Sequence, residues 1–412
     1  MGDVCCSDVD HFCVTKGEAT AKESAYSSLI QVIRSKTKHG FIPNYKAGGA
    51  GSQDRSEEMI GSKVLLEIYK QYKDKWVVEL LFDDLKDWLD WAHEHRTLGP
   101  LNLITQGSDN ITGVDGVRQP DGAMCTVQGG RYEQADDGVV YDCPGSDPVS
   151  GTPDGPGCAA IFDTSICKLT AYNVGQTSMV MVELESLATL ADVIGRPEGA
   201  ELRARASFLK NQTQQLWDDE YGVFASRFAS GSCPNNLTLC DNDKGFYRRI
   251  SPTNVWPMLT GAATAQQAET MMHAWMLNSS RFCITPEGDF KGNDPDTCYW
   301  GLPSISADDP AFPPLGYWRG FVWAPWAQLT YWALSNEAYD NIPVVVQTRK
   351  AVAKQMTAMM MEVWDKHRHI CENFSPHKSN EGNYHNGDCT GTWFYHWGGL
   401  AGLLSLLEGQ RA

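Results

Sequence analysis

The chain has 412 residues, 42% of them hydrophobic, and its 34 basic and 51 acidic residues give a formal net charge of −17. This apolar content suits a folded core and excludes general disorder, and no apolar run reaches the roughly 18–20 residues that a membrane-spanning helix needs. A pI near 5.0 without a lysine or arginine cluster argues against nucleic acid or an anionic membrane surface as a partner. The 14 tryptophans suit an acidic cleft for sugars, whose apolar faces stack on indole rings.

Apolar residues recur at helical spacing along most of the chain. The first three predicted helices contain Tyr26–Ile33, Val64–Tyr72 and Val77–Trp88, and later ones span 176–217, 253–263, 264–277, 319–335, 343–365 and 392–408. Within 176–217 the apolar stripe stops at Gly195-Arg196-Pro197 and then resumes, which predicts a helical hairpin. Strand-like alternation is scarce, so the predicted fold class is all-α.

Long irregular stretches separate these helices, and loops beyond roughly 15 residues are usually functional. They cover 36–61, 94–174, 218–252, 278–317 and 366–391. Aromatic, acidic and cysteine residues within them indicate ordered loops, except for the Pro/Gly/Ser/Asp tract at 144–157, which we expect to be a mobile flap. No break in composition divides the chain. We therefore expect an irregular segment over 1–20 and one domain over 21–412, a toroid of helical hairpins with its functional loops at one end.

Cysteines and glycosylation sequons point to an oxidising compartment. Several of the 13 cysteines are close in sequence, as the pairs Cys233/Cys240, Cys283/Cys298 and Cys371/Cys389 and the group Cys125, Cys143, Cys158 and Cys167. Such spacing favours disulfides, with free buried thiols as the alternative. Asn-x-Ser/Thr sequons occur at Asn110, Asn211, Asn236, Asn278 and Asn373. Both signals favour the secretory pathway or the extracellular space, yet Met1–Val14 has neither the basic nor the apolar region of a signal peptide.

Motif searches exclude several kinds of chemistry. No G-x-S-x-G motif supports a serine hydrolase, and no phosphate-binding loop is present. The clusters His93-Glu94-His95 and His367-Arg368-His369 place histidines two apart, on different sides of a helix, so we interpret both as solvated helix ends rather than metal sites. The sequence predicts no metal and no cofactor.

Acidic residues remain as candidates. Asp136-Asp137 lies in a loop rich in glycine and aromatics, and Glu372 lies in the segment HICENFSP. Cleavage of a glycosidic bond needs one protonated carboxyl group for the leaving oxygen and one carboxylate to activate water or attack carbon. Acids are frequent in this chain, so a turn-capping acid at Asp136-Asp137 and a surface acid at Glu372 are the alternatives.

Several long segments, in the same order, resemble conserved blocks of glycoside hydrolase family 63. They are GFIPNYKAGGAGSQDRSEEMIGSKVLLEIYK (40–70), LWDDEYGVFASRF (216–228), FYRRISPTNVWPMLTG (246–261), YWGLPSISADDPAF (299–312), YWRGFVWAPWAQLTYWAL (317–334) and FYHWGGLAGLLSLLE (394–408). The chain is most similar to the branch of mannosylglycerate- and glucosylglycerate-hydrolase-like proteins. The oligosaccharide glucosidase that trims N-glycans is a more distant relative.

This resemblance implies an (α/α)6 barrel and an inverting hydrolysis of α-linked glucosides or mannosides, with acid and base about 6.5–9.5 Å apart. It places the general base at Glu372, in the tripeptide ENF. The general acid falls at Asp136 or Asp137, because the family pattern Glu-Ser-Gly-x-Asp-Asn-Ser-Pro-x-Tyr-Asp is one residue shorter here. We prefer Asp136, since residues 136–142 then align without a gap.

The matching blocks also imply sugar-binding positions. These are Gln53, Asp54, Arg55, Tyr317, Trp318, Arg319, Trp323, Trp393 and Trp397. An arginine fork would equally bind a carboxylate such as glycerate, and core packing is an equal expectation for Trp323, Trp393 and Trp397. The family's N-terminal Trp-Asp-x-x-Phe segment corresponds here to residues 8–12, which lack the tryptophan, so we expect a truncated start.

Three functions compete at this point. The first is an inverting α-glycosidase that acts on a small glycoside such as mannosylglycerate or glucosylglycerate. The second is an oligosaccharide α-glucosidase of N-glycan processing, which the cysteines and sequons favour. The third is a non-catalytic sugar-binding barrel. In each, the partner is a carbohydrate.

Overall fold

A computed structural model shows how the chain folds. It describes residues 18–43, 46–47, 50–51, 58–107, 117–118, 124–125, 133–134, 139–140, 162–163, 165–166, 168–234, 237, 239–284, 298, 301–312, 318–376, 389–393 and 395–411. Among these residues, no helix is long and apolar enough to cross a membrane.

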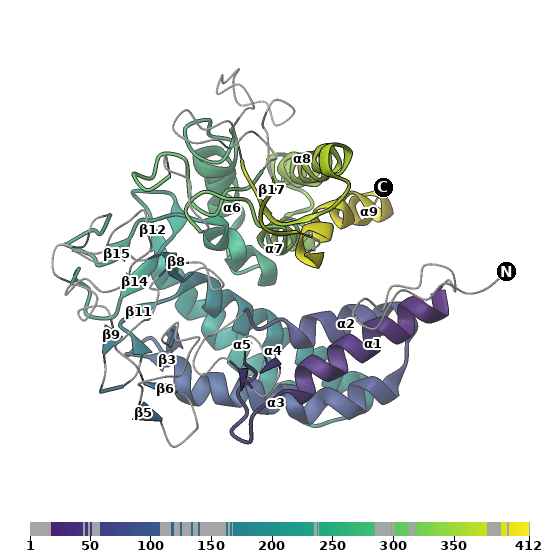
Figure 1. The fold of residues 1–412 in the computed structure, drawn as a ribbon. Helices are drawn as coiled ribbons and strands as arrows, with labels where there is room; N and C mark the ends of the chain where they lie inside the picture. Colours follow the sequence, from purple (N-terminus) through teal and green to yellow (C-terminus); the bar gives the residue numbers. More distant parts are fainter. Residues whose placement is uncertain are drawn as a thin grey trace.

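Helices form most of the described structure (Figure 1). The α-helices are α1 (Glu18–Arg34), α2 (Gly61–Tyr72), α3 (Lys75–Arg96), α4 (Val174–Ile194), α5 (Gly199–Thr213), α6 (Ala265–Met271), α7 (Ala324–Leu334), α8 (Pro343–His367) and α9 (Leu400–Arg411). Shorter helical turns are the 3₁₀ helices η3 (Gln214–Leu216), η4 (Pro252–Thr260), η7 (Glu337–Tyr339) and η8 (His396–Gly399) and the π-helix η5 (Met272–Met276). The predicted hairpin over 176–217 is confirmed as α4 and α5.

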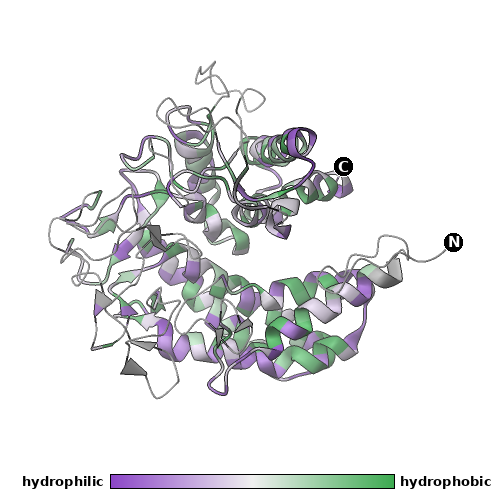
Figure 2. Ribbon diagram, in the orientation of Figure 1, coloured by the Kyte–Doolittle hydropathy of each residue, from purple (hydrophilic) through white to green (hydrophobic). Residues whose placement is uncertain are grey.

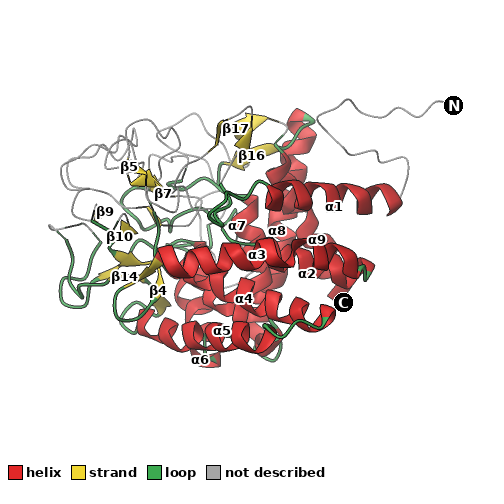
Figure 3. Cartoon of the chain, turned by 90° about the horizontal axis from the view of Figure 1, so that it is seen from below, coloured by secondary structure: helices red, strands yellow, loops and turns green. Residues whose placement is uncertain are grey.

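Short antiparallel strands occupy the long segments between the helices. They are β1 (Lys46–Ala47), β2 (Ala50–Gly51), β3 (Thr97–Leu98), β4 (Leu103–Ile104), β5 (Val117–Arg118), β6 (Met124–Cys125), β7 (Glu133–Gln134), β8 (Val139–Val140), β9 (Phe162–Asp163), β10 (Lys168–Leu169), β11 (Ala171–Tyr172), β12 (Trp217–Asp218), β13 (Val223–Phe224), β14 (Ser226–Phe228), β15 (Phe246–Tyr247), β16 (Cys371–Phe374) and β17 (Cys389–Trp393). The strands labelled from β4 to β14 gather at one end of the helices (Figure 3). The helix predicted over 392–408 is wrong at its start, because Thr392 and Trp393 belong to β17, in which Trp393 pairs with Cys371 of β16.

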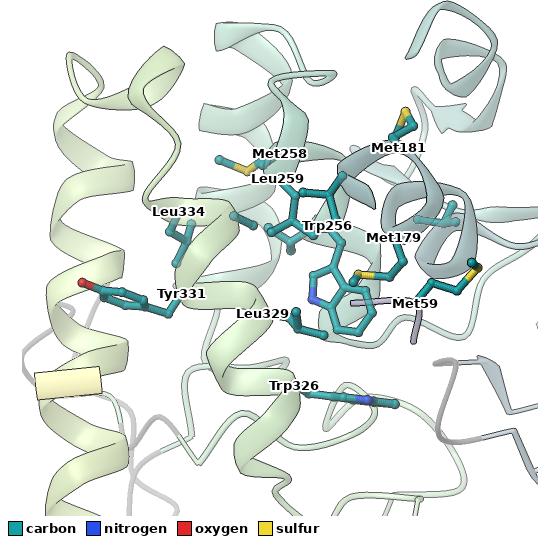
Figure 4. Close-up of a cluster of buried hydrophobic side chains, with 14 of the residues drawn as sticks. Met59, Met179, Met181, Trp256, Met258, Leu259, Trp326, Leu329, Tyr331 and Leu334 are labelled. Carbon is teal, nitrogen blue, oxygen red and sulfur yellow. The ribbon is translucent and has the colours of Figure 1, made fainter. Parts of the chain in front are cut away.

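Five helices form a row in which each packs against the next. Helix α2 packs against α4, α4 against η4, η4 against α7 and α7 against α9. Hydrophobic residues dominate α4, whereas α5, on the outside, mixes hydrophobic and hydrophilic residues (Figure 2). Figure 4 shows the meeting point of these helices, where Trp256 of η4 lies edge-on to Trp326 of α7 at 6.2 Å between ring centroids. The Trp256 indole N–H also donates to Thr330 Oγ1 over 3.2 Å.

Local sequence signals fix where two of these central helices begin and end. The Asn173 side chain accepts the Gln176 N–H at the start of α4, and Gly195, at φ +73°, ends the helix as predicted. A capping box of Ser251 and Asn254 opens η4, which follows strand β15 closely. Both helices start just after a strand, so the loops in front of them gather at the end of the molecule that carries the strands.

Candidate active site

The hairpin of β16 and β17 carries the predicted base, Glu372. The two strands are joined by a disulfide between Cys371 and Cys389, and their register shifts between Cys371 and Asn373. Gly391, at φ +73°, stands at this irregularity. A bulge with a glycine in the left-handed region turns backbone and side chains out of their regular alternation, and such bulges are common beside active sites.

The bulge holds the carboxylate of Glu372 from one side. The Thr392 backbone N–H donates to Glu372 Oε2 over 2.8 Å. A Cβ atom at Gly391 would lie 2.6 Å from the same oxygen, so only glycine leaves room for the carboxylate. Glu372 is 9% exposed, which places it at the boundary between core and solvent. The alternative of an ordinary surface acid is therefore wrong.

Two helix starts flank this hairpin. Val322, just before α7, exchanges two backbone hydrogen bonds with Phe374 of β16, at 2.8 and 3.0 Å. On the other side, η8 packs so closely that a Cβ at Gly398 would lie 2.3 Å from the Cys371 carbonyl oxygen. Glu372 is consequently attached to the elements that carry Trp323 and Trp397.

These two tryptophans and Trp318 form one aromatic cluster. Trp318 and Trp323 stack with ring centroids 3.6 Å apart, and Trp397 lies edge-on to Trp323 at 5.8 Å. Trp318 and Trp323 are 4% and 0% exposed. Packing against other side chains therefore occupies most of their surface, whereas Trp397 is half-buried.

An aromatic cavity of about 300 Å³ opens beside these rings, between α2, α7 and the start of α9. Its lining consists of Glu58, Ile60, Val64, Trp318, Trp323, Pro325, Trp326, Gln328, Leu329, Trp332, Trp397 and Leu400. A mostly apolar wall with few polar groups is typical of a small-molecule site.

Two polar residues of this cavity were not predicted as site residues. Glu58 accepts the indole N–H of Trp326 over 2.8 Å. Gln328 is 5% exposed, and within the described part of the chain neither atom of its amide has a hydrogen-bond partner. Glu58 could have been predicted from the sequence, because it lies in the block 40–70 close to the predicted sugar-binding residues Gln53-Asp54-Arg55. For Gln328 the sequence gives none, because helical periodicity places it among core residues.

Arg319 lies beside Trp318 and is 5% exposed. Burial lowers its pKa from 12.5 to about 10, because removal from water penalises the charged guanidinium. The side chain is still a cation at neutral pH. A buried cation next to an aromatic wall can bind an anionic or hydroxylated ligand.

The histidine clusters differ from each other. His93 and Glu94 are exposed at the end of α3, as predicted. His369 is buried, which corrects its interpretation as part of a solvated helix end, since it packs beneath the hairpin. Its ring stacks on Trp393 at 4.6 Å, and its nitrogen lies with the sulfurs of Cys371 and Cys389 within 4.8 Å. Three such ligands could hold a metal ion only with both cysteines reduced, because the disulfide uses their thiolates.

Comparison with known proteins decides the family. A family model of the mannosylglycerate hydrolase MGH1-like glycoside hydrolase domain matches residues 12–397. The chain belongs to this family. The family predicted from the sequence blocks is thereby confirmed, and the protein is a glycoside hydrolase.

Solved structures share the fold of this MGH1-like hydrolase. An uncharacterized conserved protein from Thermus thermophilus is similar with a TM-score of 0.63 and 16% identity, over 93% of this chain and 88% of that one. The GH63 mannosylglycerate hydrolase of the same organism, in complex with glucose, is similar with a TM-score of 0.59 and 16% identity. The match covers 94% of this chain and 88% of that one. Neutral trehalase Nth1 from Saccharomyces cerevisiae has a TM-score of 0.56 and 16% identity, over 95% of this chain and 68% of the trehalase. A comparison with curated protein sequences finds no match.

Several predicted site residues of the MGH1-like hydrolase lie outside the described residues. They are Gln53, Asp54, Arg55, Asp136, Asp137 and Tyr317, as is the expected flap at 144–157. Strands β7 and β8 pair on either side of the segment that contains Asp136 and Asp137. Trp393 is described and is 63% exposed, directly after the amide that binds Glu372.

The disulfide prediction is confirmed for three pairs: Cys233–Cys240, Cys283–Cys298 and Cys371–Cys389. One of the predicted glycosylation sites is wrong. Asn373 is 0% exposed in β16, so the folded chain cannot present it for glycosylation. Asn211 is exposed on α5, and Asn110 and Asn236 lie outside the described residues.

Proposed function

We propose that this protein is an inverting α-glycosidase that hydrolyses small α-linked glucosides or mannosides, such as mannosylglycerate or glucosylglycerate. The observation that carries the proposal is the Glu372 carboxylate, held by the Thr392 N–H on a hairpin whose neighbouring elements supply Trp323 and Trp397 to the wall of an aromatic cavity. Supporting it, a mannosylglycerate hydrolase of similar fold has been solved with glucose and, at a TM-score of 0.58, with Tris and D-glycerate.

In the proposed reaction Glu372 takes a proton from a water molecule, whose oxygen attacks the anomeric carbon. Asp136, or Asp137 as the alternative, donates a proton to the glycosidic oxygen as the bond to the aglycone breaks. Because water enters opposite the leaving group, the two carboxyl groups must stand about 6.5–9.5 Å apart and the anomeric configuration inverts. The Thr392 N–H keeps one carboxylate oxygen in place, so that the base meets the water without rearrangement.

Substrate binding is assigned to residues of both walls. We assign Gln53, Asp54 and Arg55 to binding of sugar hydroxyls, together with Tyr317 and Arg319, and Trp397 and Trp393 to stacking on sugar faces. The fixed fork of an arginine suits either hydroxyls or the carboxylate of glycerate. For the architecture we propose one (α/α)6 barrel over 21–412, of which the row α2, α4, η4, α7 and α9 supplies central helices.

The deciding experiment follows hydrolysis of a panel of α-glucosides and α-mannosides, including the glycerate glycosides, by proton NMR. We expect the β-anomer of the released sugar to appear first, with mutarotation later. Initial release of the α-anomer would overturn the inverting mechanism. In the same assay Asp136→Asn should abolish turnover and Asp137→Asn should retain part of it; the reverse result moves the general acid to Asp137.

An oligosaccharide α-glucosidase is the second candidate, favoured by the three disulfides, which suit the compartment in which N-glycans are processed. Glucosylated oligomannose glycans in the same panel separate the two. Faster cleavage of the glycan than of glucosylglycerate selects the second candidate. Tight sugar binding without cleavage of any panel member indicates a non-catalytic barrel.

A further inference from the structure

We propose that the disulfide Cys371–Cys389 and the bulge at Gly391 together position the Glu372 carboxylate, so that turnover depends on the oxidation state of this one cysteine pair. The proposal rests on the proposed role of Glu372 as general base. It adds positioning residues, Gly391 and the two cysteines, that touch neither water nor sugar and act through Glu372.

The position of the carboxylate is set by backbone atoms of β17. Thr392 donates its N–H to Glu372 Oε2 over 2.8 Å, and a Cβ at Gly391 would lie 2.6 Å from that oxygen and 2.9 Å from Asn373 Nδ2. Any displacement of β17 along β16 therefore moves both the donor and the gap in which the carboxylate fits. Because a misplacement of about 1 Å can reduce a rate by roughly 100-fold, the register of these strands controls turnover.

The disulfide fixes this register. It joins the residue directly before Glu372 to the first residue of β17, and β16 is otherwise paired with β17 along only a few residues. Two-stranded ribbons are marginal by themselves, so a covalent bond at this point has a large share in holding the strands together. The other two described disulfides, Cys233–Cys240 and Cys283–Cys298, lie elsewhere in the sequence and do not join β16 to β17.

The pair is also placed for exchange with a dithiol. Cys371 is buried, whereas Cys389 is half-buried, so a dithiol reagent meets the Cys389 sulfur first. Its thiolate bonds to Cys389 Sγ, the S–S bond breaks, and Cys371 leaves as a thiolate that takes up a proton. The second thiol of the reagent then displaces Cys389 and closes a cyclic disulfide, so that two electrons pass from the dithiol to the protein.

His369 stands at the point where the Cys389 thiolate is released. Its Nδ1 lies 2.9 Å from the His367 carbonyl oxygen and therefore carries the hydrogen, and its Nε2 faces Cys389 Sγ at 3.5 Å. An imidazole nitrogen in this position can accept a hydrogen bond from the Cys389 thiol once the disulfide is reduced. The same contact is missing for Cys233–Cys240 within the described hydrogen bonds, which makes that pair a suitable control.

The first test compares two double variants, Cys371→Ser/Cys389→Ser and Cys233→Ser/Cys240→Ser, on the best α-glycoside of the panel. We expect the first to reduce kcat about 100-fold with KM within threefold of wild type, and the second to keep both. Wild type and the second variant should lose activity in dithiothreitol and recover it on reoxidation. A Cys371→Ser/Cys389→Ser variant with wild-type kcat would overturn the proposal.

A second test leaves every cysteine in place and decides the matter if the cysteine variant does not fold. Gly391→Ala pushes a methyl group against Glu372 Oε2, whereas Gly231→Ala, at the matching φ of +74°, meets nothing within 4 Å. Both carry the same backbone strain, which should lower both melting temperatures, and the contact with Glu372 should lower that of Gly391→Ala further. Only Gly391→Ala should lower kcat, by about 100-fold; equal kcat values for the two variants contradict the positioning role.

A readout without catalysis separates this proposal from the proposed function. Hydrogen exchange of the peptide 389–393, followed by mass spectrometry, reports whether the Thr392 amide stays bonded to Glu372. We expect at least tenfold faster exchange in Cys371→Ser/Cys389→Ser than in wild type. Faster exchange in a protein that cleaves no glycoside supports the positioning and rejects the enzyme function; unchanged exchange rejects the positioning.

Discussion

The hairpin around Glu372 and the contact between α2 and α4 each contain a carboxylate bound by backbone amides, yet they differ in what the carboxylate does. Glu183 of α4 is 1% exposed and accepts the N–H groups of Ser62 and Lys63 over 2.7 and 2.8 Å, at the start of α2. It joins two helices. Glu372 lies on a bulged hairpin between two helix starts that supply Trp323 and Trp397 to the wall of an aromatic cavity. Burial and amide hydrogen bonding are common to both, so it is the surroundings that mark Glu372 as the candidate catalytic base.

The largest expected effect is on turnover. Glu372→Gln should lower kcat about 10³- to 10⁴-fold, because the amide cannot take a proton from water; this corresponds to roughly 4–5.5 kcal/mol in the activation barrier. Its melting temperature should stay close to that of wild type. Glu183→Gln is the matched control, and its folded fraction should keep wild-type kcat. Equal loss of kcat in both variants would break the distinction between the two carboxylates.

A third carboxylate, Asp309, extends the comparison to stability. It is paired with Arg249 through two contacts, Nε to Oδ2 at 2.8 Å and Nη2 to Oδ1 at 3.0 Å, with 2% and 3% of the side chains exposed. Asp309→Asn removes the charge that Asp309 sets against the buried guanidinium and should cost about 3–5 kcal/mol in the free energy of unfolding. Denaturant titration measures this loss.

The neighbouring Asp308 provides the control, because its side chain is 42% exposed and pairs with Arg281 at 3.1 Å. Asp308→Asn should cost no more than about 1 kcal/mol. If both aspartates lose the same amount, the buried pair is not the reason why the segment 301–312 stays attached to 246–251.

Helical periodicity was sufficient for the helix-rich fold class and for most helix positions. The stop at Gly195 marked the end of α4, since glycine adopts the left-handed region there at little cost. The same reasoning failed at Thr392 and Trp393. Their pairing with β16 depends on a disulfide and a bulge, which are contacts between residues about 20 positions apart. Short-range periodicity carries no information on such contacts.

The third prediction concerns pH. Burial raises the pKa of Glu183 from 4.5 to about 7, because little water reaches its charge, although the amides of Ser62 and Lys63 oppose the shift. The folded-state pKa lies above that of the unfolded chain, so the associated stability is fully present below about pH 4.5 and is lost as the pH rises through about 7. The loss amounts to roughly 3 kcal/mol.

Unfolding of wild type and Glu183→Gln at a series of pH values isolates this contribution, since glutamine does not titrate. The free energy of unfolding of wild type, minus that of the variant, should decrease between pH 4.5 and 8. If this difference instead increases with pH, the amides at the start of α2 hold Glu183 in its ionised form. The charge state of Glu183 would then be that of a catalytic carboxylate.

For the candidate site, residue type and family resemblance put forward Glu372 as a candidate but not the groups that hold its carboxylate. Gly391 and the Thr392 amide became visible only with the register shift between the strands, because a backbone N–H leaves no trace in residue type. Gln328 is similar, since its spacing in α7 is that of a core residue and only the cavity beside it distinguishes it.

The smallest expected effect separates sugar stacking from packing on the hairpin itself. Trp393 is 63% exposed and stacks on His369 with ring centroids 4.6 Å apart. If it also receives a sugar face, Trp393→Ala should raise KM about fivefold, equivalent to ~1 kcal/mol, and Trp393→Phe should restore most of the affinity. Trp364→Ala on α8, where the indole is 41% exposed, controls for the loss of a surface tryptophan. An unchanged KM in Trp393→Ala, with a fall in melting temperature, would assign Trp393 to packing over His369, so that the hairpin would contribute Glu372 alone to the site.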